Sequence, residues 1–190
     1  KETLRIAKED YAEKTVEVMG IGKKGGDILS KTLPVRSRHD AVYDDLNFGN
    51  TTEVALQAMD AFAKGEYDKV LVVYNQFKNA ATQIVMTEQF LPIVAEQDVT
   101  QNVPADYIYE PSQTAIVDEL LPKSLKMQLF KAIRDSFASE HGARMTAMHK
   151  ATDNATELRD QLKLTYNKAR QAAITNEILE IVGGAEALNN

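Results

Sequence analysis

Three glycines near the N-terminus have the spacing of a loop that could bind a nucleotide. Gly20, Gly22 and Gly25 form G-x-G-x-x-G, the pattern of loops that bind dinucleotides through backbone N–H groups. The stretch follows a predicted strand at residues 15–21 and opens a predicted short helix at residues 22–31. Acidic residues that could hold a ribose lie about twenty positions later, at Asp40, Asp44 and Asp45. A tight strand-to-helix turn would use the same glycines for its backbone alone, so a dinucleotide-binding oxidoreductase and a structural turn are both open.

The remaining residue types offer no catalytic centre. The chain has no cysteine, which excludes thiol catalysis, disulfides and cysteine-ligated zinc. It contains neither G-x-x-x-x-G-K-[ST] nor G-x-S-x-G, the phosphate-binding and serine-nucleophile patterns. His141 and His149 are about two helical turns apart and could not share a metal ion without a third element. Outside the glycine pattern, we therefore expect no catalytic centre, no cofactor site and no metal site.

The composition and net charge of the chain restrict the classes of partner that it could bind. The chain has 190 residues, 44% of them hydrophobic and 26% charged, with a net charge of −6. This is the balance of a folded, soluble protein, and the negative charge argues against nucleic acid as a partner. No apolar run approaches the roughly 18–20 residues that cross a bilayer.

The first part of the chain alternates helices and strands. We predict helices at residues 4–13, 22–31 and 51–64, with Asn50 as the N-cap of the last. Residues 33–43 should be extended, and strands are predicted at 15–21, 68–75, 81–91 and 107–109. The run 68–75 is apolar at successive positions, which predicts burial on both faces, and the strand at 81–91 should pair with it as a hairpin turning at residues 78–80. Residues 1–111 are thus expected to form a layered α/β domain.

The second part, residues 112–190, should be a helical shaft. Residues 112–121 predict a short helix, and Pro122 fits the first turn of a following long helix. Between Pro122 and Gly183 only Gly142 interrupts. The long helix would measure roughly 90–100 Å, too long to bury its apolar residues against its own domain. From Phe130 a stripe of mostly apolar residues follows alternating steps of four and three, as in a coiled coil with polar interruptions. We call this stripe the seam; its members are Phe130, Arg134, Phe137, His141, Arg144, Met148, Ala151, Ala155, Leu158, Leu162, Thr165, Ala169, Ala172, Asn176 and Leu179.

Charged residues gather in the last third of the long helix. Lys163, Lys168 and Arg170 are followed by Glu177 and Glu180. Such a run can be a solvated helix face, or a patch that meets oppositely charged loops of a partner.

Several of these segments resemble the gamma subunit of F-type ATP synthases. Residues 139–148, 151–155 and 166–178 are similar to its C-terminal helix. The family has Ile-Thr near its C-terminus, a Glu two positions later, an acid three further on, and then Gly-Ala. Ile174-Thr175, Glu177, Glu180 and Gly184-Ala185 match that pattern. Residues 21–25, 73–78 and 109–112 agree with the family as well, so the resemblance extends over essentially the whole chain.

The resemblance implies an α/β protein, with a small Rossmann-like layered domain and a very long C-terminal coiled-coil helix. It implies a non-catalytic central-stalk rotor that transmits rotation between the membrane ring and the catalytic hexamer during proton-coupled ATP synthesis. The implied partners are the alpha and beta subunits, the epsilon subunit and the membrane c-ring, at the cytoplasmic face of a bacterial inner membrane. Residues matching family positions that contact the catalytic ring are Arg170, Gln171, Thr175 and Glu180. Tyr107 and Glu110 match positions on the domain that face the rotor ring or epsilon.

One departure from the family changes the expected behaviour. Family members begin with a long helix and a first strand that have no counterpart before Lys1, so we expect an N-terminally truncated chain with an incomplete α/β domain. The seam would then lack its partner helix, and self-association through the seam is expected. A coiled-coil adaptor unrelated to ATP synthesis remains a further alternative.

Overall fold

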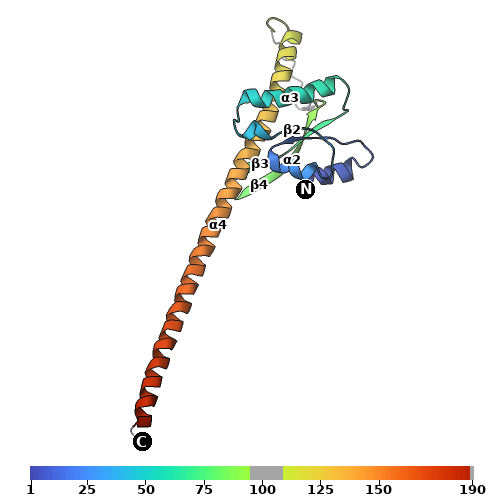
Figure 1. The fold of residues 1–190 in the computed structure, drawn as a ribbon. Coiled ribbons are helices and arrows are strands. Elements are labelled where there is room, and N and C mark those ends of the chain that lie inside the picture. The colour runs from blue at the N-terminus through green and yellow to red at the C-terminus, as the bar shows by residue number, and fades with distance from the viewer. Residues whose placement is uncertain (95–108, 189–190) are drawn as a thin grey trace, which may run out of the picture. The chain divides into compact units, whose positions relative to one another are not determined.

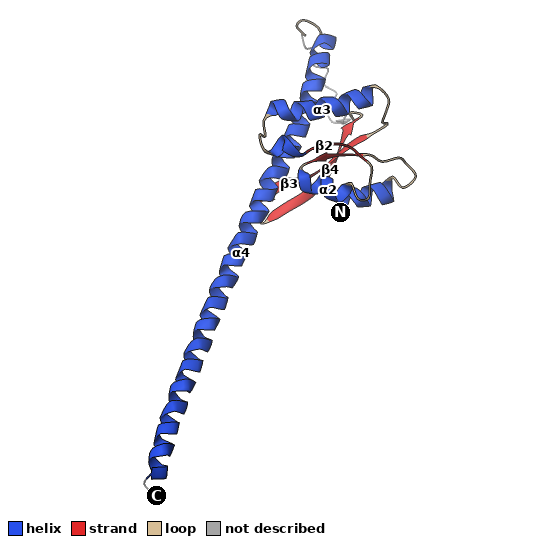
Figure 2. Cartoon of the chain, in the orientation of Figure 1, coloured by secondary structure: helices blue, strands red, loops and turns tan. Residues whose placement is uncertain are grey.

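Two pairs of β-strands make up the sheets of this protein, in a computed structural model that describes residues 1–94 and 109–188. Strand β1 (Val18–Ile21) runs parallel to β2 (Val35–His39), and helix α2 (Lys23–Leu29) connects them. Strand β3 (Val70–Asn79) pairs antiparallel with β4 (Thr82–Leu91). The strands are drawn in red in Figure 2. The alternation of helices and strands predicted from the sequence is therefore confirmed over these residues.

The β3–β4 hairpin is longer than expected, and its first strand is less buried. Strand β3 continues to Asn79, and the turn falls at residues 80–81. Tyr74 is buried, but Val70, Leu71, Val72 and Val73 are only half-buried. The prediction of burial on both faces was wrong, because a sheet of two strands does not supply the neighbours that would cover both sides.

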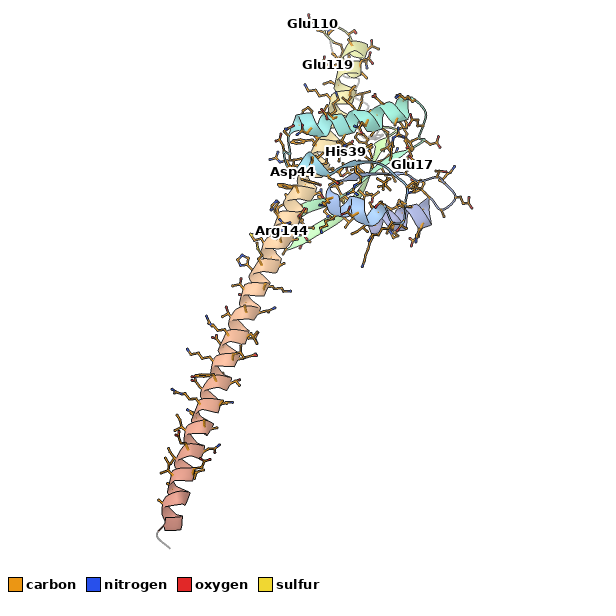
Figure 3. All side chains as sticks on the ribbon, in the orientation of Figure 1. Glu17, His39, Asp44, Glu110, Glu119 and Arg144 are labelled. Carbon is orange, nitrogen blue, oxygen red and sulfur yellow. The ribbon has the colours of Figure 1, made fainter. Side chains whose placement is uncertain are left out.

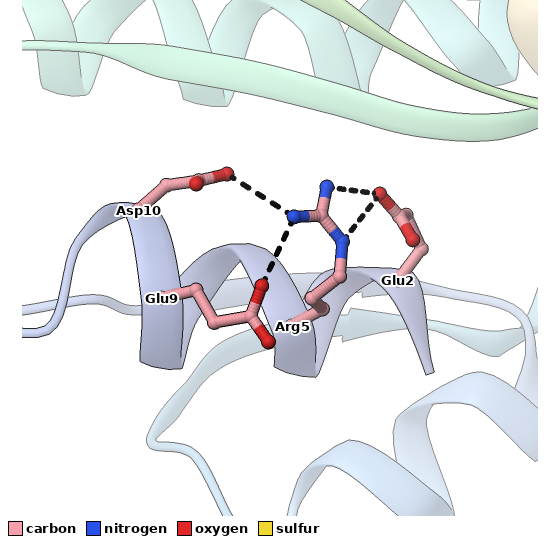
Figure 4. A network of polar contacts seen from close by, with 4 residues as sticks. All are labelled: Glu2, Arg5, Glu9 and Asp10. Atoms are coloured by element: carbon pink, nitrogen blue, oxygen red, sulfur yellow. Dashed lines mark hydrogen bonds and ion pairs between the residues drawn. The ribbon is translucent and has the colours of Figure 1, made fainter.

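A short helical segment opens the chain. Helix α1 (Glu2–Arg5) continues into a π-helical turn (Ile6–Asp10) in which the Tyr11 N–H donates to the Ile6 carbonyl. Arg5 lies between three carboxylates, those of Glu2, Glu9 and Asp10 (Figure 4). Its Nη2 is 2.6 Å from the Glu2 carboxylate. These groups are exposed, and exposed pairs contribute little to stability.

Helix α3 (Phe48–Ala63) begins three residues earlier than predicted. Its N-cap is Asn47, whose Oδ1 accepts a hydrogen bond from the Asn50 N–H at 2.8 Å. The assignment of Asn50 as the N-cap was therefore wrong. Asn50 instead provides the backbone N–H that the cap satisfies, as the third residue of the first turn does in a capped helix.

The core joins the hairpin, α3 and the beginning of the long helix α4. Its buried residues are Val42, Val54, Ala55, Phe90, Leu91, Leu125, Leu129 and Ile133. Met19 and Ile21 of β1 pack against the same cluster, so both sheets share one core. Ring contacts extend it: Tyr43 stacks on Phe137, and Phe48 meets Phe130 edge-on, each at 5.8 Å between centroids.

Helix α4 (Gln113–Leu188) is one continuous helix (Figure 1). The predicted continuity from Pro122 onward is confirmed, but the separate short helix was wrong, because Pro122 lies inside α4. Ser112 caps the helix, with its Oγ accepting from the Ala115 N–H at 3.2 Å. A proline inside a helix costs about 3 kcal/mol, and burial of Leu125 and Leu129 just beyond it offsets that cost.

Contacts divide the chain within α4. The first compact unit runs from Lys1 to Ala143 and the second from Arg144 to Asn190, whereas the boundary expected from element type falls at residue 111. Phe130 and Phe137, which we assigned to the seam, pack on the domain's own rings. The expectation that the seam cannot pack on its own domain was therefore wrong for these two positions.

Candidate functional site on the C-terminal helix

The glycines at the end of β1 lie close to other residues of the same chain. Gly22 has φ 95° and ψ 145° and precedes α2 as its N-cap, in a region that side chains rarely adopt. A Cβ on Gly22 would lie 2.8 Å from Cε2 of Tyr43, and one on Gly20 would lie 3.3 Å from the Cα of Gly26. A Cβ on Gly25 would meet no atom within 4 Å.

Arg38 covers the beginning of α2. A Cβ on Gly26 would lie 2.9 Å from its Nε. The Arg38 Nη2 also pairs with Asp27 Oδ1 at 2.8 Å and Asp40 Oδ2 at 2.9 Å. Asp40 is one of the acids that a dinucleotide fingerprint would assign to the ribose. These contacts account for Gly20 and Gly22 as parts of a strand-to-helix turn, the second interpretation of the pattern, whereas no contact accounts for its third glycine, Gly25.

The part of α4 in the second unit carries exposed apolar residues along the predicted seam. Leu158, Leu162 and Leu179 are 56%, 60% and 62% exposed. Every described side chain from Ala147 to Ala185 is exposed. Apolar stripes of this extent are typical of surfaces that bind other proteins.

A second, shorter apolar face, which the sequence analysis missed, lies at residues 174–181 of the same helix. Ile174, Ile178 and Ile181 follow steps of four and three, so they share one face of the helix. At 100° per residue they lie roughly 100° or more from Leu179 of the seam. All three are about half exposed or more. The isoleucine spacing was visible in the sequence, but it was not separated from the seam.

The four residues assigned to the catalytic-ring contact are all exposed on α4. Gln171 and Thr175 lie one turn apart, and the Thr175 hydroxyl donates to the Gln171 carbonyl at 2.9 Å. Arg170 is on a neighbouring face and Glu180 lies roughly 80° from it, on the side away from Gln171. Helix geometry thus brings Gln171 and Thr175 together and leaves Glu180 on a different face.

Arg170 offers a charged group to a partner. Within the described residues no ion pair involves its guanidinium. Ile174, Glu177 and Ile181 share its face of the helix at steps of four, seven and eleven, so one positive charge lies beside apolar residues. Arginine can bind a carboxylate with two parallel hydrogen bonds.

The two residues assigned to the domain's contact with the membrane ring differ in what the structure describes. Glu110 is exposed, just before α4 (Figure 3). Tyr107 lies outside the described residues, as does most of the predicted strand at 107–109; Tyr109 belongs to no helix or strand.

The described parts of the chain show neither a metal site nor a membrane-spanning helix. Residues 1–94 and 109–188 contain no group of three or more His, Cys, Asp or Glu side chains placed to hold a metal ion. None of the helices described is both long and apolar enough to cross a membrane.

Together these features define a class of protein in which a small α/β domain continues into a long helix with exposed apolar residues. The chain belongs to the ATP synthase family, whose model matches residues 1–188, and its relatives are gamma chains. It is 67% identical to the ATP synthase gamma chain of Flavobacterium johnsoniae, over 94% of this chain and 63% of that one. It is 64% identical to that of Christiangramia forsetii, over 96% and 64%. The chain thus spans somewhat less than two thirds of the length of these relatives.

Solved structures share the fold. A chain of the Euglena gracilis mitochondrial ATP synthase, solved with the c-ring in rotational state 3, matches with a TM-score of 0.62 and 22% identity, over 98% of this chain and 67% of that one. A rotor chain of the same enzyme in rotational state 1 gives a TM-score of 0.58, at 20% identity over 91% and 68%. The expected fold, a small sheet domain with a long C-terminal helix, is confirmed.

Proposed function

We propose that the chain is the central shaft of a bacterial ATP synthase, transmitting rotation between the membrane ring and the catalytic hexamer. The observation that carries this proposal is the exposed seam of α4, together with the second apolar face that Ile174, Ile178 and Ile181 form near its end. A helix that is apolar on more than one face needs cover on more than one side. A paired helix would cover the seam, and the surrounding alpha and beta subunits would cover Ile174, Ile178 and Ile181.

The shaft supplies no group to phosphoryl transfer. The sequence has no phosphate-binding loop, and catalysis of this reaction depends on such positioning groups. The shaft would act by differential contacts that favour different conformations of the catalytic subunits in turn. Arg170, Gln171, Thr175 and Glu180 would make those contacts, and Tyr107 and Glu110 would contact the epsilon subunit and the c-ring. The bacterial relatives support a place at the cytoplasmic face of the inner membrane.

The test is reconstitution of an ATP synthase whose gamma chain carries this sequence. We expect this complex to couple ATP hydrolysis to proton pumping, and the same preparation without the gamma chain to hydrolyse ATP without pumping. Equal pumping with and without the chain would contradict the proposal. For the dinucleotide alternative, NAD(H) is titrated into the protein by calorimetry; heat that Gly22→Ala removes would favour that function instead.

The exposed seam also predicts self-association of this chain by itself. The leucines of the seam leave apolar surface in water, at a cost of about 25 cal/mol per Å². Sedimentation at increasing concentration should show a dimer or larger species, and Leu158→Lys with Leu162→Lys should shift it toward monomer. Glu157→Lys with Lys163→Glu, off the seam, serves as the control. A monomer at all concentrations would overturn this part of the proposal.

A further inference from the structure

The buried residues of α4 differ in size along the helix. The first include the large side chains of Leu125, Leu129 and Ile133, which are 7%, 5% and 4% exposed. The last are Ser139, 1% exposed, and Gly142, the last buried residue of the described helix. At Ser139 and Gly142 the small residues let the helix backbone approach its neighbour more closely.

That neighbour is the β3–β4 hairpin. The Ser139 Oγ donates to the carbonyl oxygen of Asn75 at 3.1 Å. A Cβ on Gly142 would lie 3.1 Å from Cε2 of Phe77 and 3.2 Å from the Cα of Ala80. We call the contact of Ser139 and Gly142 with Asn75, Phe77 and Ala80 the hairpin seat.

The turn of the hairpin is held by its own polar contacts. Asn79 Oδ1 accepts from the Ala81 N–H at 3.0 Å, and Gln83 Nε2 donates to the Ala80 carbonyl at 3.2 Å. Because these bonds are local to the turn, they fix the backbone against which Gly142 packs. The hairpin seat therefore joins the backbone of α4 to a hairpin turn whose backbone is already fixed.

A second polar contact joins the same two elements nearer the start of α4. The Tyr74 hydroxyl donates to Glu88 Oε1 at 2.6 Å, and Gln128 Nε2 donates to Glu88 Oε2 at 3.4 Å. Gln128 and Gly142 are fourteen residues apart, roughly 21 Å along the helix. The hairpin thus holds α4 at two separated points, both off the helix axis.

We propose that the hairpin seat fixes the rotational setting of α4 on the domain and carries twist from the domain into the rest of the helix. The proposal rests on the function proposed above. Apolar side chains can exchange rotamers when a helix turns, but a backbone approach through glycine cannot adapt. Turning α4 by one residue, about 100°, would bring Glu140 or Ala143 to the hairpin, and neither could replace Ser139 or Gly142 there.

The test compares two substitutions at adjacent positions of α4. Gly142→Val places a branched side chain into Phe77 and Ala80, while Ala143→Val makes the same side chain at an exposed position. In an ATP synthase carrying this sequence in its gamma chain, we expect Gly142→Val to lower the protons pumped per ATP hydrolysed several-fold. Ala143→Val should leave the ratio unchanged. Phe77→Ala, which removes one of the opposing groups, should restore part of the loss in the double variant.

Milder variants keep the test decisive if Gly142→Val fails to assemble. Gly142→Ala and Ser139→Ala should each lower the pumping ratio while the complex forms and hydrolyses ATP. Hydrogen exchange in the chain itself should accelerate at β3, β4 and residues 139–146 in these variants and not in Ala143→Val. Faster exchange with an unchanged pumping ratio would overturn the proposal and leave the shaft function intact. Unchanged exchange would overturn the seat itself, and pumping that persists without the chain would contradict the shaft function instead.

Discussion

Tyr74 is a buried titratable group whose protonation state is linked to stability. Burial raises the pKa of its phenol above the usual value, and the hydrogen bond to the Glu88 carboxylate raises it further. The neutral phenol is the form that fits this site, because the phenolate would be desolvated and would lie beside a negative charge.

The raised pKa gives a prediction for alkaline pH. In the unfolded chain Tyr74 titrates near its ordinary pKa of about 10, whereas in the folded protein it stays protonated to higher pH. Above about pH 10 the folded state binds more protons, so the free energy of unfolding should fall as pH rises. Denaturant unfolding between pH 8 and about 11 should show a shallower fall in Tyr74→Phe. The fall should not vanish, since burial also raises the pKa of Tyr43 and Tyr67. Identical pH profiles for the two proteins would contradict this.

Helix α3 depends on a cap that one side chain supplies. Asn47→Ala removes the acceptor for the Asn50 N–H and should lower the free energy of unfolding by about 1 kcal/mol. Asn47→Ser keeps an acceptor at the same place and should lose only a small part of that stability. Denaturant unfolding of both variants measures the difference. Equal losses would mean that the capping bond contributes nothing measurable.

Most elements could be predicted from local sequence, and the exceptions have physical causes. The β3–β4 hairpin and α3 were expected because apolar runs and helical spacing are local signals. The cap was misplaced because Asn47 and Asn50 are equally good candidates by residue type, and only the backbone path decides between them. Pro122 appeared to begin a helix because local rules place proline in the first turn. The packing of Leu125 and Leu129, which sustains the helix around it, involves distant residues.

Tertiary contacts also determine what covers each part of the seam. The seam reads as one stripe from Phe130 to Leu179, yet Phe130 and Phe137 pack on the domain while Leu158 and Leu162 are exposed. Periodicity identifies a face of a helix and gives no information on what covers it. The resemblance to a known family supplied the partners that the spacing could not. The isoleucine face at Ile174 was within reach of the sequence, because its spacing is as regular as that of the seam.

For the molecule as a whole, the central prediction tests the proposed shaft function and concerns its coupling to a surrounding catalytic ring. Arg170 has no ion-pair partner within the described part of the chain and lies beside Ile174 and Ile181. A carboxylate on the surrounding ring would pair with it in a partly enclosed site, where salt screens less than on an open surface. A hydrogen-bonded charged contact of this kind contributes about 2 kcal/mol. Arg170→Glu would replace that attraction with repulsion.

We expect Arg170→Glu to lower ATP-driven proton pumping more than ATP hydrolysis in the reconstituted complex, because the proposed shaft acts through contacts with the ring and not through the chemistry of phosphoryl transfer. Lys163→Glu is the matched control: it makes the same charge change on the same helix face, two turns away, and should have a smaller effect. Arg170→Lys keeps the charge but loses the two-bonded geometry, so it should fall between the wild type and Arg170→Glu. Wild-type ratios in Arg170→Glu, or an equal loss in Lys163→Glu, would show that coupling does not depend on a specific contact at this residue.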